Sequence, residues 1–186
     1  MGAITMIWQS RKAKAISEDA CFAEFSPQCG IFFDYLKRLI TDELIPWEEH
    51  FGFLAKEVPS HWIETDNTLA AINKVHPIDR IGILRVPANT CYDWHVDSHR
   101  LCCVNMLLSG GSNSLTLFGG ERAGRQTRQI IPIEYKPRTF YLFNNQIEHT
   151  VINLGPERFL FSLYFKTERM FDVVYAKLDA AGLLAD

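Results

Sequence analysis

The chain has 186 residues, of which 47% are hydrophobic, 12% aromatic and 22% charged, and its formal net charge is -3 at pH 7. This composition excludes an intrinsically disordered chain, and the length suits one sizeable core rather than two full domains. The small negative charge gives no global electrostatic reason to expect nucleic acid or an anionic membrane as a partner.

The cysteines and the apolar runs indicate a cytoplasmic protein. The five cysteines are odd in number and form no Cys-x-x-Cys pair, which is typical of reduced thiols. Residues 1–8 lack the long apolar core of a signal peptide, and no apolar run approaches the roughly 20 residues of a membrane span. We therefore expect a single domain over residues 1–186, without membrane contact.

Residues 1–76 are expected to be mostly helical, with a first stretch that could add a short edge strand. Over Ile31–Leu44, hydrophobic side chains recur at helical spacing and charged side chains occupy the other side. Pro46 ends this helix because proline cannot continue the hydrogen-bond ladder. A second helix is expected over Thr68–Val75, after the capping-type run Thr65-Asp66-Asn67.

From Arg80 the pattern changes to short β-rich segments separated by glycine, proline and asparagine turns. Eight strands are expected, over Arg80–Val86, Tyr92–Val96, Arg100–Leu108, Ser114–Phe118, Arg128–Tyr135, Thr139–Phe143, Glu148–Asn153 and Arg158–Phe165. Their number and spacing predict a jelly roll, the cupin-like double-stranded β-helix, over residues 80–165. Residues 167–184 are expected to form a terminal helix packed against the sheet. The predicted fold class is mainly β with flanking helices.

A metal-binding pattern is divided between two of these strands. His95-x-Asp97 places an imidazole and a carboxylate two residues apart at the end of the second expected strand, and His149 lies on the seventh. Two histidines and one carboxylate are the ligand set of mononuclear non-haem Fe(II) oxygenases, which leaves three positions on the metal open. Strands two and seven are neighbours in a jelly roll, so the three residues can meet.

Strand alternation predicts that an arginine lies in the same cavity. In the seventh expected strand, alternate residues share one face: His149, Val151 and Asn153. In the eighth, the corresponding set is Arg158, Leu160 and Ser162. If His149 points into the barrel, Arg158 can point into the same cavity from the neighbouring strand. A buried arginine needs an anionic partner, and a co-substrate carboxylate would supply one in bidentate geometry.

The run from Phe143 to Asn153, followed by Arg158, resembles the aspartyl/asparaginyl β-hydroxylases and their proline-hydroxylase-like relatives among the 2-oxoglutarate and Fe(II)-dependent oxygenases. The resemblance covers roughly residues 80–165. It implies Fe(II) as cofactor and 2-oxoglutarate and O2 as co-substrates. The animal aspartyl β-hydroxylases that name the branch lack the carboxylate ligand that Asp97 provides, so their substrate is not carried over to this chain.

The resemblance also implies roles for individual residues. His95, Asp97 and His149 become the catalytic iron ligands, and Arg158 pairs with the distal carboxylate of 2-oxoglutarate. Two further residues are implied in co-substrate binding, Ser162 and Asn105. The implied reaction is hydroxylation of an amino acid, free or within a peptide or protein, with release of succinate and CO2.

Two other functions fit parts of the pattern. One is nucleic-acid demethylation on the same fold, which the net charge and the sequence Phe-Leu-Phe-Ser after Arg158 disfavour, because a second arginine is missing there. The other is a non-catalytic cupin-like protein that binds a metal or an organic acid. A zinc-protease helix through His99 is disfavoured, since Val96 stands where His-Glu-x-x-His requires glutamate.

Several residues near the centre are candidates for substrate contact. Arg85, Tyr92, Asp93 and Trp94 flank it, although strand alternation predicts that Tyr92 and Trp94 face away from His95. The segment from Gly119 to Gln129 carries three arginines, Arg122, Arg125 and Arg128. Solvated charge is their default interpretation, and recognition of an acidic substrate is the alternative.

Overall fold

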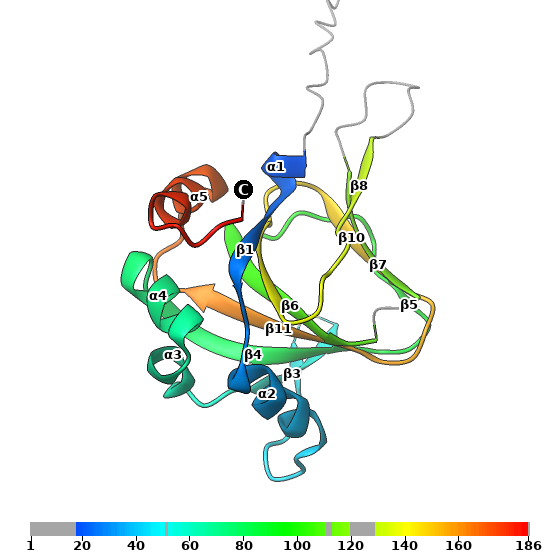
Figure 1. Cartoon of the computed structure of the whole chain (residues 1–186). Helices are drawn as coiled ribbons and strands as arrows, with labels where there is room; N and C mark the ends of the chain where they lie inside the picture. Colours follow the sequence, from blue (N-terminus) through cyan, green and yellow to red (C-terminus); the bar gives the residue numbers. More distant parts are fainter. Residues whose placement is uncertain (1–17, 51, 111–112, 120–128, 186) are drawn as a thin grey trace, which may run out of the picture.

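The computed structural model describes residues 18–50, 52–110, 113–119 and 129–185, and two antiparallel sheets that face each other dominate this part of the chain (Figure 1). The larger sheet has seven strands in the order β1-β9-β6-β11-β4-β3-β2, and the smaller has four in the order β5-β10-β7-β8. This non-sequential order is that of a jelly roll, and it confirms the predicted mainly β, cupin-like fold.

The strands of the larger sheet are β1 (Phe22–Gln28), β2 (Glu48–His50), β3 (Phe53–Glu57), β4 (Ile78–Val86), β6 (Cys102–Ser109), β9 (Thr139–Asn144) and β11 (Arg158–Phe165). Those of the smaller sheet are β5 (Thr90–Cys91), β7 (Ser114–Gly119), β8 (Ile130–Pro132) and β10 (His149–Asn153). The helices are α1 (Glu18–Cys21), α2 (Ile31–Thr41), α3 (Trp62–Thr65), α4 (Asn67–Val75) and α5 (Phe171–Ala180). No helix in the described part of the chain is long and apolar enough to span a membrane.

Three strands of the larger sheet lie where the sequence predicted mostly helix. β1 pairs with β9, more than a hundred residues away, and β3 pairs with β4 while β2 forms the sheet edge. β1 and β3 become strands because segments further along the chain, β9 and β4, complete their hydrogen bonds, and β2 then pairs with β3 across a short turn. The helical prediction for residues 1–76 was therefore wrong for β1, β2 and β3.

The helices match their predictions with shifted ends. α2 ends at Thr41 rather than Leu44, because Asp42 already has extended backbone angles and the buried Lys56 donates to the carbonyl of Leu39 at 3.0 Å. α4 begins after Asp66, whose carboxylate accepts from two amides of the first turn at 3.0 Å each. α5 begins at Phe171 instead of Thr167.

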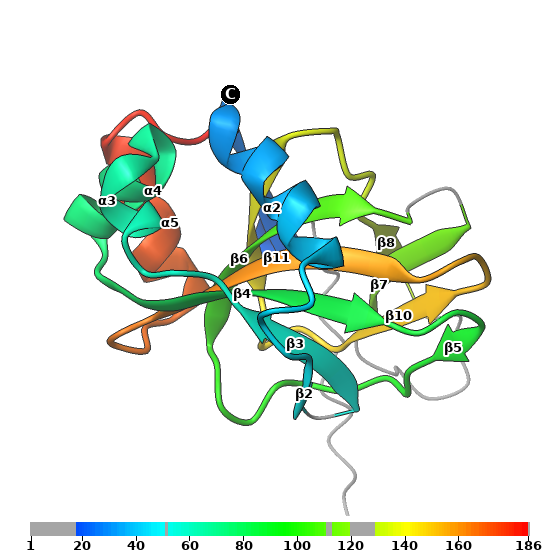
Figure 2. The ribbon, with the colours of Figure 1, turned by 90° about the horizontal axis from the view of Figure 1, so that it is seen from below.

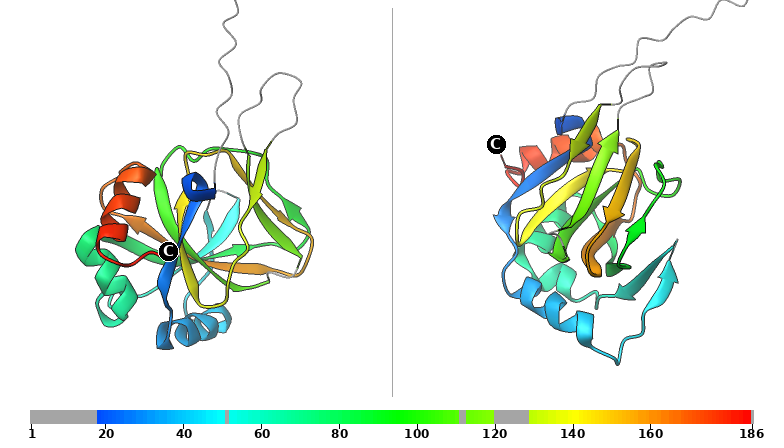
Figure 3. Two further views of the ribbon diagram at one scale, coloured as in Figure 1. Left: turned by 45° about the horizontal axis from the view of Figure 1, so that its top comes forward. Right: turned by 90° about the vertical axis from the view of Figure 1, so that its right-hand side faces the viewer.

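The main hydrophobic core lies between the helices and the outer face of the larger sheet (Figure 2). Phe161 on β11 is fully buried there and meets Phe32 and Phe140 edge-on, at ring-centroid distances of 5.4 and 5.6 Å. A second cluster fills part of the space between the two sheets, where Phe118 and Phe143 pack 4.5 Å apart. Another part of that space is a cavity lined by both polar and apolar side chains; the two sheets that enclose it are seen from two further sides in Figure 3.

Candidate metal centre

His95, Asp97 and His149 meet between the two sheets. His95 pairs with His149 through two backbone hydrogen bonds of 3.0 and 2.9 Å, although the chain around His95 is not a continuous strand. The expected second strand, Tyr92–Val96, was therefore wrong as a strand: the strand in this region is β5, which ends before Tyr92, and within the expected range the structure has the isolated bridge at His95. Its predicted neighbour, β10, is confirmed.

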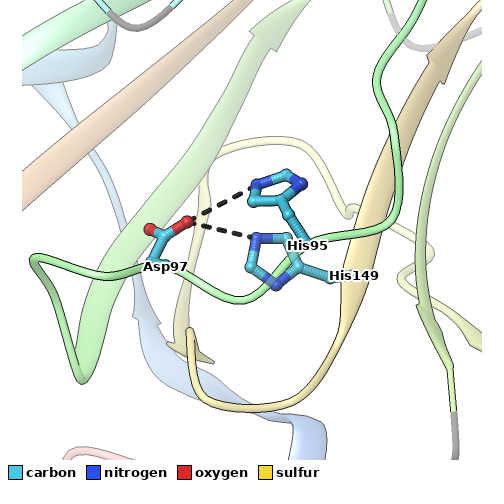
Figure 4. A group of neighbouring side chains, drawn as sticks. All are labelled: His95, Asp97 and His149. Carbon is cyan, nitrogen blue, oxygen red and sulfur yellow. Dashed lines mark ion pairs between the residues drawn. The ribbon is translucent and has the colours of Figure 1, made fainter.

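The three side chains converge on one point (Figure 4). Asp97 Oδ1 lies 3.5 Å from His95 Nε2 and 3.7 Å from His149 Nε2, and one ligand atom from each residue falls within a 4.8 Å span. Ligand atoms about 2.1 Å from a shared ion and at right angles are roughly 3 Å apart. The observed separations are close to this, so the donor set fits one metal ion bound on a single face.

Each histidine is oriented by a backbone carbonyl. His95 Nδ1 lies 2.8 Å from the carbonyl oxygen of Asp93, and His149 Nδ1 lies 2.9 Å from that of Ile147. A carbonyl can only accept, so both Nδ1 atoms carry a proton, and in the neutral imidazole Nε2 is then the nitrogen whose lone pair is available to a metal. The tautomer needed for ligation is therefore set by the fold.

The protonation states favour ligation by His149 and Asp97 in particular. Burial lowers the pKa of His149 to about 4, so its imidazole is neutral near pH 7. Burial by itself raises the pKa of Asp97, but its hydrogen bond to His95 and the charge of Arg100 outweigh this and hold it below the usual range. The hydrogen bond to Asp97 raises the pKa of His95, so the carboxylate and this imidazole stabilise each other's charged forms.

An inner cavity of about 70 Å³ connects the three ligands to Arg158. Arg158 is only 2% exposed, and it reaches across the interior to donate to Ser114 Oγ at 3.0 Å and Thr116 Oγ1 at 2.8 Å. Its guanidinium carbon lies 5.3 Å from the ring centre of Tyr135. No carboxylate of the described residues pairs with it, and burial lowers its pKa. The Arg158 end of the cavity therefore carries a positive charge that is not paired with a carboxylate of the described residues.

Several buried polar atoms around this cavity have no hydrogen-bond partner among the described residues. They are Asn105 Oδ1, Tyr135 OH, Asn145 Oδ1 and Arg158 Nε. All four residues line the inner cavity. Buried polar groups normally find partners, and leaving one unpaired costs about 1–3 kcal/mol. Their concentration in one small cavity indicates a binding site for a polar ligand, and the two donors among them, Tyr135 OH and Arg158 Nε, could pair with an anionic group of it.

An outer cavity of about 420 Å³ lies on the other side of the ligands. Both cavities share a set of lining residues, Phe53, Leu84, His95, Asp97 and Arg100. Phe53 and Tyr92 stack in its wall with ring centres 4.4 Å apart, and Tyr92 OH donates to the carbonyl of Gly52 at 2.8 Å. The candidate metal ligands thus lie between the small inner cavity, which contains charged side chains, and the larger outer cavity, whose wall is partly aromatic.

The remaining candidates occupy different places. Asn105 lines the inner cavity as expected. Ser162 lies opposite Asn105 in the sheet but accepts from Arg100 at 3.3 Å, and Leu160 separates it from Arg158 along the strand face. Its predicted assistance to Arg158 is therefore replaced by a contact with Arg100.

Two further expectations need correction. Arg158 does not lie on a strand paired with that of His149, because β10 and β11 belong to different sheets, and the two side chains face each other across the interior. Tyr92 lines the outer cavity instead of facing away, since strand alternation does not apply to the irregular chain after Cys91. His99 also lines this cavity and is not part of the metal cluster.

Other functional candidates were missed or lie outside the described residues. Three of them, Arg122, Arg125 and Arg128, lie outside the described residues. Arg100 and Asn145, which hydrogen-bond to Asp97, and Thr116, which binds Arg158, were not singled out from the sequence. For Arg100 a signal existed, because it follows Asp97 by three residues.

The fold agrees with that of several solved structures. An oxidoreductase of the 2OG-Fe(II) oxygenase family from Burkholderia pseudomallei is 12% identical with a TM-score of 0.52, over 72% of this chain and 76% of that one. A prolyl-4-hydroxylase from Pseudomonas putida is 14% identical with a TM-score of 0.51, over 75% and 85%. A prolyl hydroxylase from Trichoplax adhaerens, in complex with a hypoxia inducible factor peptide fragment, is 12% identical with a TM-score of 0.54, over 84% and 86%.

Sequence comparison gives no such relation: no protein-family model matches the chain, and no match to a curated protein was found. At these low identities the structural likeness shows the fold alone. The chain therefore has the fold of the 2-oxoglutarate and Fe(II)-dependent oxygenases, and it carries a His-x-Asp and His cluster at its centre.

Proposed function

We propose that this protein is a non-haem Fe(II) and 2-oxoglutarate-dependent oxygenase. His95, Asp97 and His149 would hold Fe(II), and Arg158 would bind the distal carboxylate of 2-oxoglutarate. The observation that carries the proposal is the inner cavity, where unpaired buried polar atoms and an arginine without a carboxylate lie beside the three metal ligands. A dicarboxylate would satisfy the arginine and reach toward the metal.

The chain's own residues supply binding and orientation. Ser114 and Thr116 hold two nitrogens of Arg158, which fixes the plane of the guanidinium before any ligand arrives. Burial strengthens the attraction between this cation and a carboxylate, because little water remains to screen it. Tyr135, whose pKa burial raises to about 12, remains a neutral phenol that can donate a hydrogen bond.

When bound, Fe(II) with 2-oxoglutarate and O2 supplies the oxidising chemistry, with succinate and CO2 as products. The two histidines contribute neutral nitrogen donors in fixed tautomers, and Asp97 contributes one negative charge. Hydrophobic side chains around the inner cavity, among them Phe143 and Leu160, limit access of water to the centre.

The substrate we propose is an amino acid, free or within a peptide or protein, which is hydroxylated in the outer cavity. Two of the similar solved structures are prolyl hydroxylases, and one of them holds a peptide fragment. The outer cavity adjoins the metal ligands and offers the stacked rings of Phe53 and Tyr92 as an apolar wall. A small molecule or peptide is accordingly the expected partner.

An anaerobic titration tests the oxygenase function. Fe(II) and 2-oxoglutarate added together should produce a weak visible charge-transfer band, and admission of O2 should release succinate slowly without substrate. His149→Ala should lose the band. His99→Ala is the matched control, because this histidine is exposed at the outer cavity and lies outside the metal cluster; it should keep the band. Folded wild-type protein with neither band nor succinate would refute the proposal.

A further inference from the structure

Arg100 lies three residues after Asp97 and directs its guanidinium back at that carboxylate. Nε and Nη2 each lie 2.9 Å from Asp97 Oδ2. Asn145 Nδ2 donates to the same oxygen at 2.7 Å. Oδ2 therefore accepts from three donors, whereas Oδ1 faces the Nε2 atoms of the two histidines.

We infer that Arg100 is a positioning residue that, with Asn145, holds Asp97 so that a single carboxylate oxygen is presented to the metal. The inference rests on the proposed metal centre. A carboxylate can bind a metal through one oxygen or through both. If Oδ2 also bound, one of the three positions that the ligand set leaves open would be lost to it. Three donors on Oδ2 occupy its lone pairs and prevent this.

The arginine itself is held on several sides. Its Nη1 donates to Ser162 Oγ at 3.3 Å, and its guanidinium stacks on the ring of Tyr164, 4.8 Å from the centroid. Tyr164 OH in turn lies 2.8 Å from His50 Nε2. These contacts leave the Arg100 side chain 18% exposed, in contrast to the solvated ion pair of Arg138, which is 38% exposed.

The backbone at Asp97 and Arg100 is hydrogen-bonded to the turn that contains Asn145 and Gln146. Gln146 Nε2 donates to the carbonyls of both residues at 3.0 Å, and the Asp97 amide donates to the Asn145 carbonyl at 3.1 Å. The turn before β10 therefore fixes the backbone of the ligand as well as its side chain. A surface ion pair without such support would contribute little, but a preorganised guanidinium limits the carboxylate to one orientation.

Arg80 offers a matched control within the same stack. Its guanidinium lies over the same Tyr164 ring at the same centroid distance of 4.8 Å, but it forms an ion pair with Asp79, an exposed residue outside the metal cluster. Replacing Arg80 removes a stacked cation without touching a metal ligand. Replacing Arg100 removes a similar cation and frees Asp97 Oδ2.

The test measures binding of Mn(II) by electron paramagnetic resonance and the absorption spectrum of the Co(II) protein, with no turnover needed. Arg100→Gln should weaken Mn(II) binding by about 10–100-fold, as loss of a residue that orients a ligand does elsewhere, and should change the Co(II) spectrum. Arg100→Lys should recover part of the affinity because it keeps the charge and one donor. Arg80→Gln should stay within about twofold of the wild type.

Asn145→Ala provides a milder variant, should Arg100→Gln fail to fold, and should weaken Mn(II) binding less. Equal affinities and spectra for Arg100→Gln and wild type, or equal losses in Arg100→Gln and Arg80→Gln, would overturn the inference and leave the metal centre intact. For a folded Asn145→Ala, an unchanged affinity and spectrum would overturn it too. A wild-type protein that binds neither ion would refute the metal centre, and the positioning role with it.

Discussion

The two faces of the seven-stranded sheet differ in character although the same strands supply both. On β11 the residues that face the helices are Phe159, Phe161, Leu163 and Phe165, and all belong to or pack against the main core. The residues between them face the four-stranded sheet, and there Arg158 and Ser162 make side-chain hydrogen bonds. Each step along the strand thus alternates between packing and polar contact.

Equal burial has opposite consequences on these two faces. Phe161 is 0% exposed and Arg158 is 2% exposed. Burial of the phenyl ring removes apolar surface from water and stabilises the fold by a few kcal/mol. Burial of a guanidinium that has hydroxyl partners but no carboxylate costs stability. One face therefore holds the fold together, and the other keeps binding groups ready at the expense of stability.

The largest expected effect comes from truncating the helix-facing side. Phe161→Ala should lower the free energy of unfolding by about 3–5 kcal/mol, because it leaves a cavity in a fully packed core. Its neighbour Leu160 lines the inner cavity and is only partly buried. Leu160→Ala should therefore lower the free energy of unfolding by only about 1 kcal/mol. Urea denaturation of both variants measures the difference. Similar losses would show that the two faces contribute equally.

Arg158→Met tests the interior face. We expect 2-oxoglutarate binding to weaken by about 10–100-fold, because a charged hydrogen bond worth about 1.5–3 kcal/mol is lost. The free energy of unfolding should stay the same or rise, since a buried charge is replaced by an apolar side chain of similar length. Isothermal titration of the Mn(II) protein measures the first, and urea denaturation the second. Unchanged 2-oxoglutarate affinity would remove Arg158 from the site.

The smallest effect concerns a histidine on the helix side. His76 is buried against Phe165 at 4.6 Å, and burial lowers its pKa from 6.5. Between the lowered value and 6.5 the unfolded chain binds more protons, so the free energy of unfolding falls as the pH falls below about 6.5. His76→Gln should make this decline shallower. Parallel stability curves for the two proteins between pH 5 and 7 would contradict the burial effect.

Elements defined by local sequence signals could be predicted, whereas those that depend on partners far along the chain could not. The strands from β4 onward, except β5, were found from alternation and turn residues, which are local signals. β1 was missed because its hydrogen-bond partner, β9, is distant along the chain. β3 was missed because its local sequence pattern allows either a helix or a strand, and its pairing with β4 decides for the strand. The ends of α2 shifted because Asp42 is already extended and Lys56 reaches the last turn of the helix from β3.

The sequence by itself determined which three residues meet at the centre, because His95-x-Asp97 and His149 belong to segments that a jelly roll makes neighbours. It also determined that Arg158 is buried and in need of an anion, through the period of two along β11. Only the tertiary structure decided that Arg158 faces His149 from the opposite sheet and that Ser162 supports Arg100. The physical reason is that alternation fixes a side chain's face, whereas the packing of two sheets fixes what that face meets.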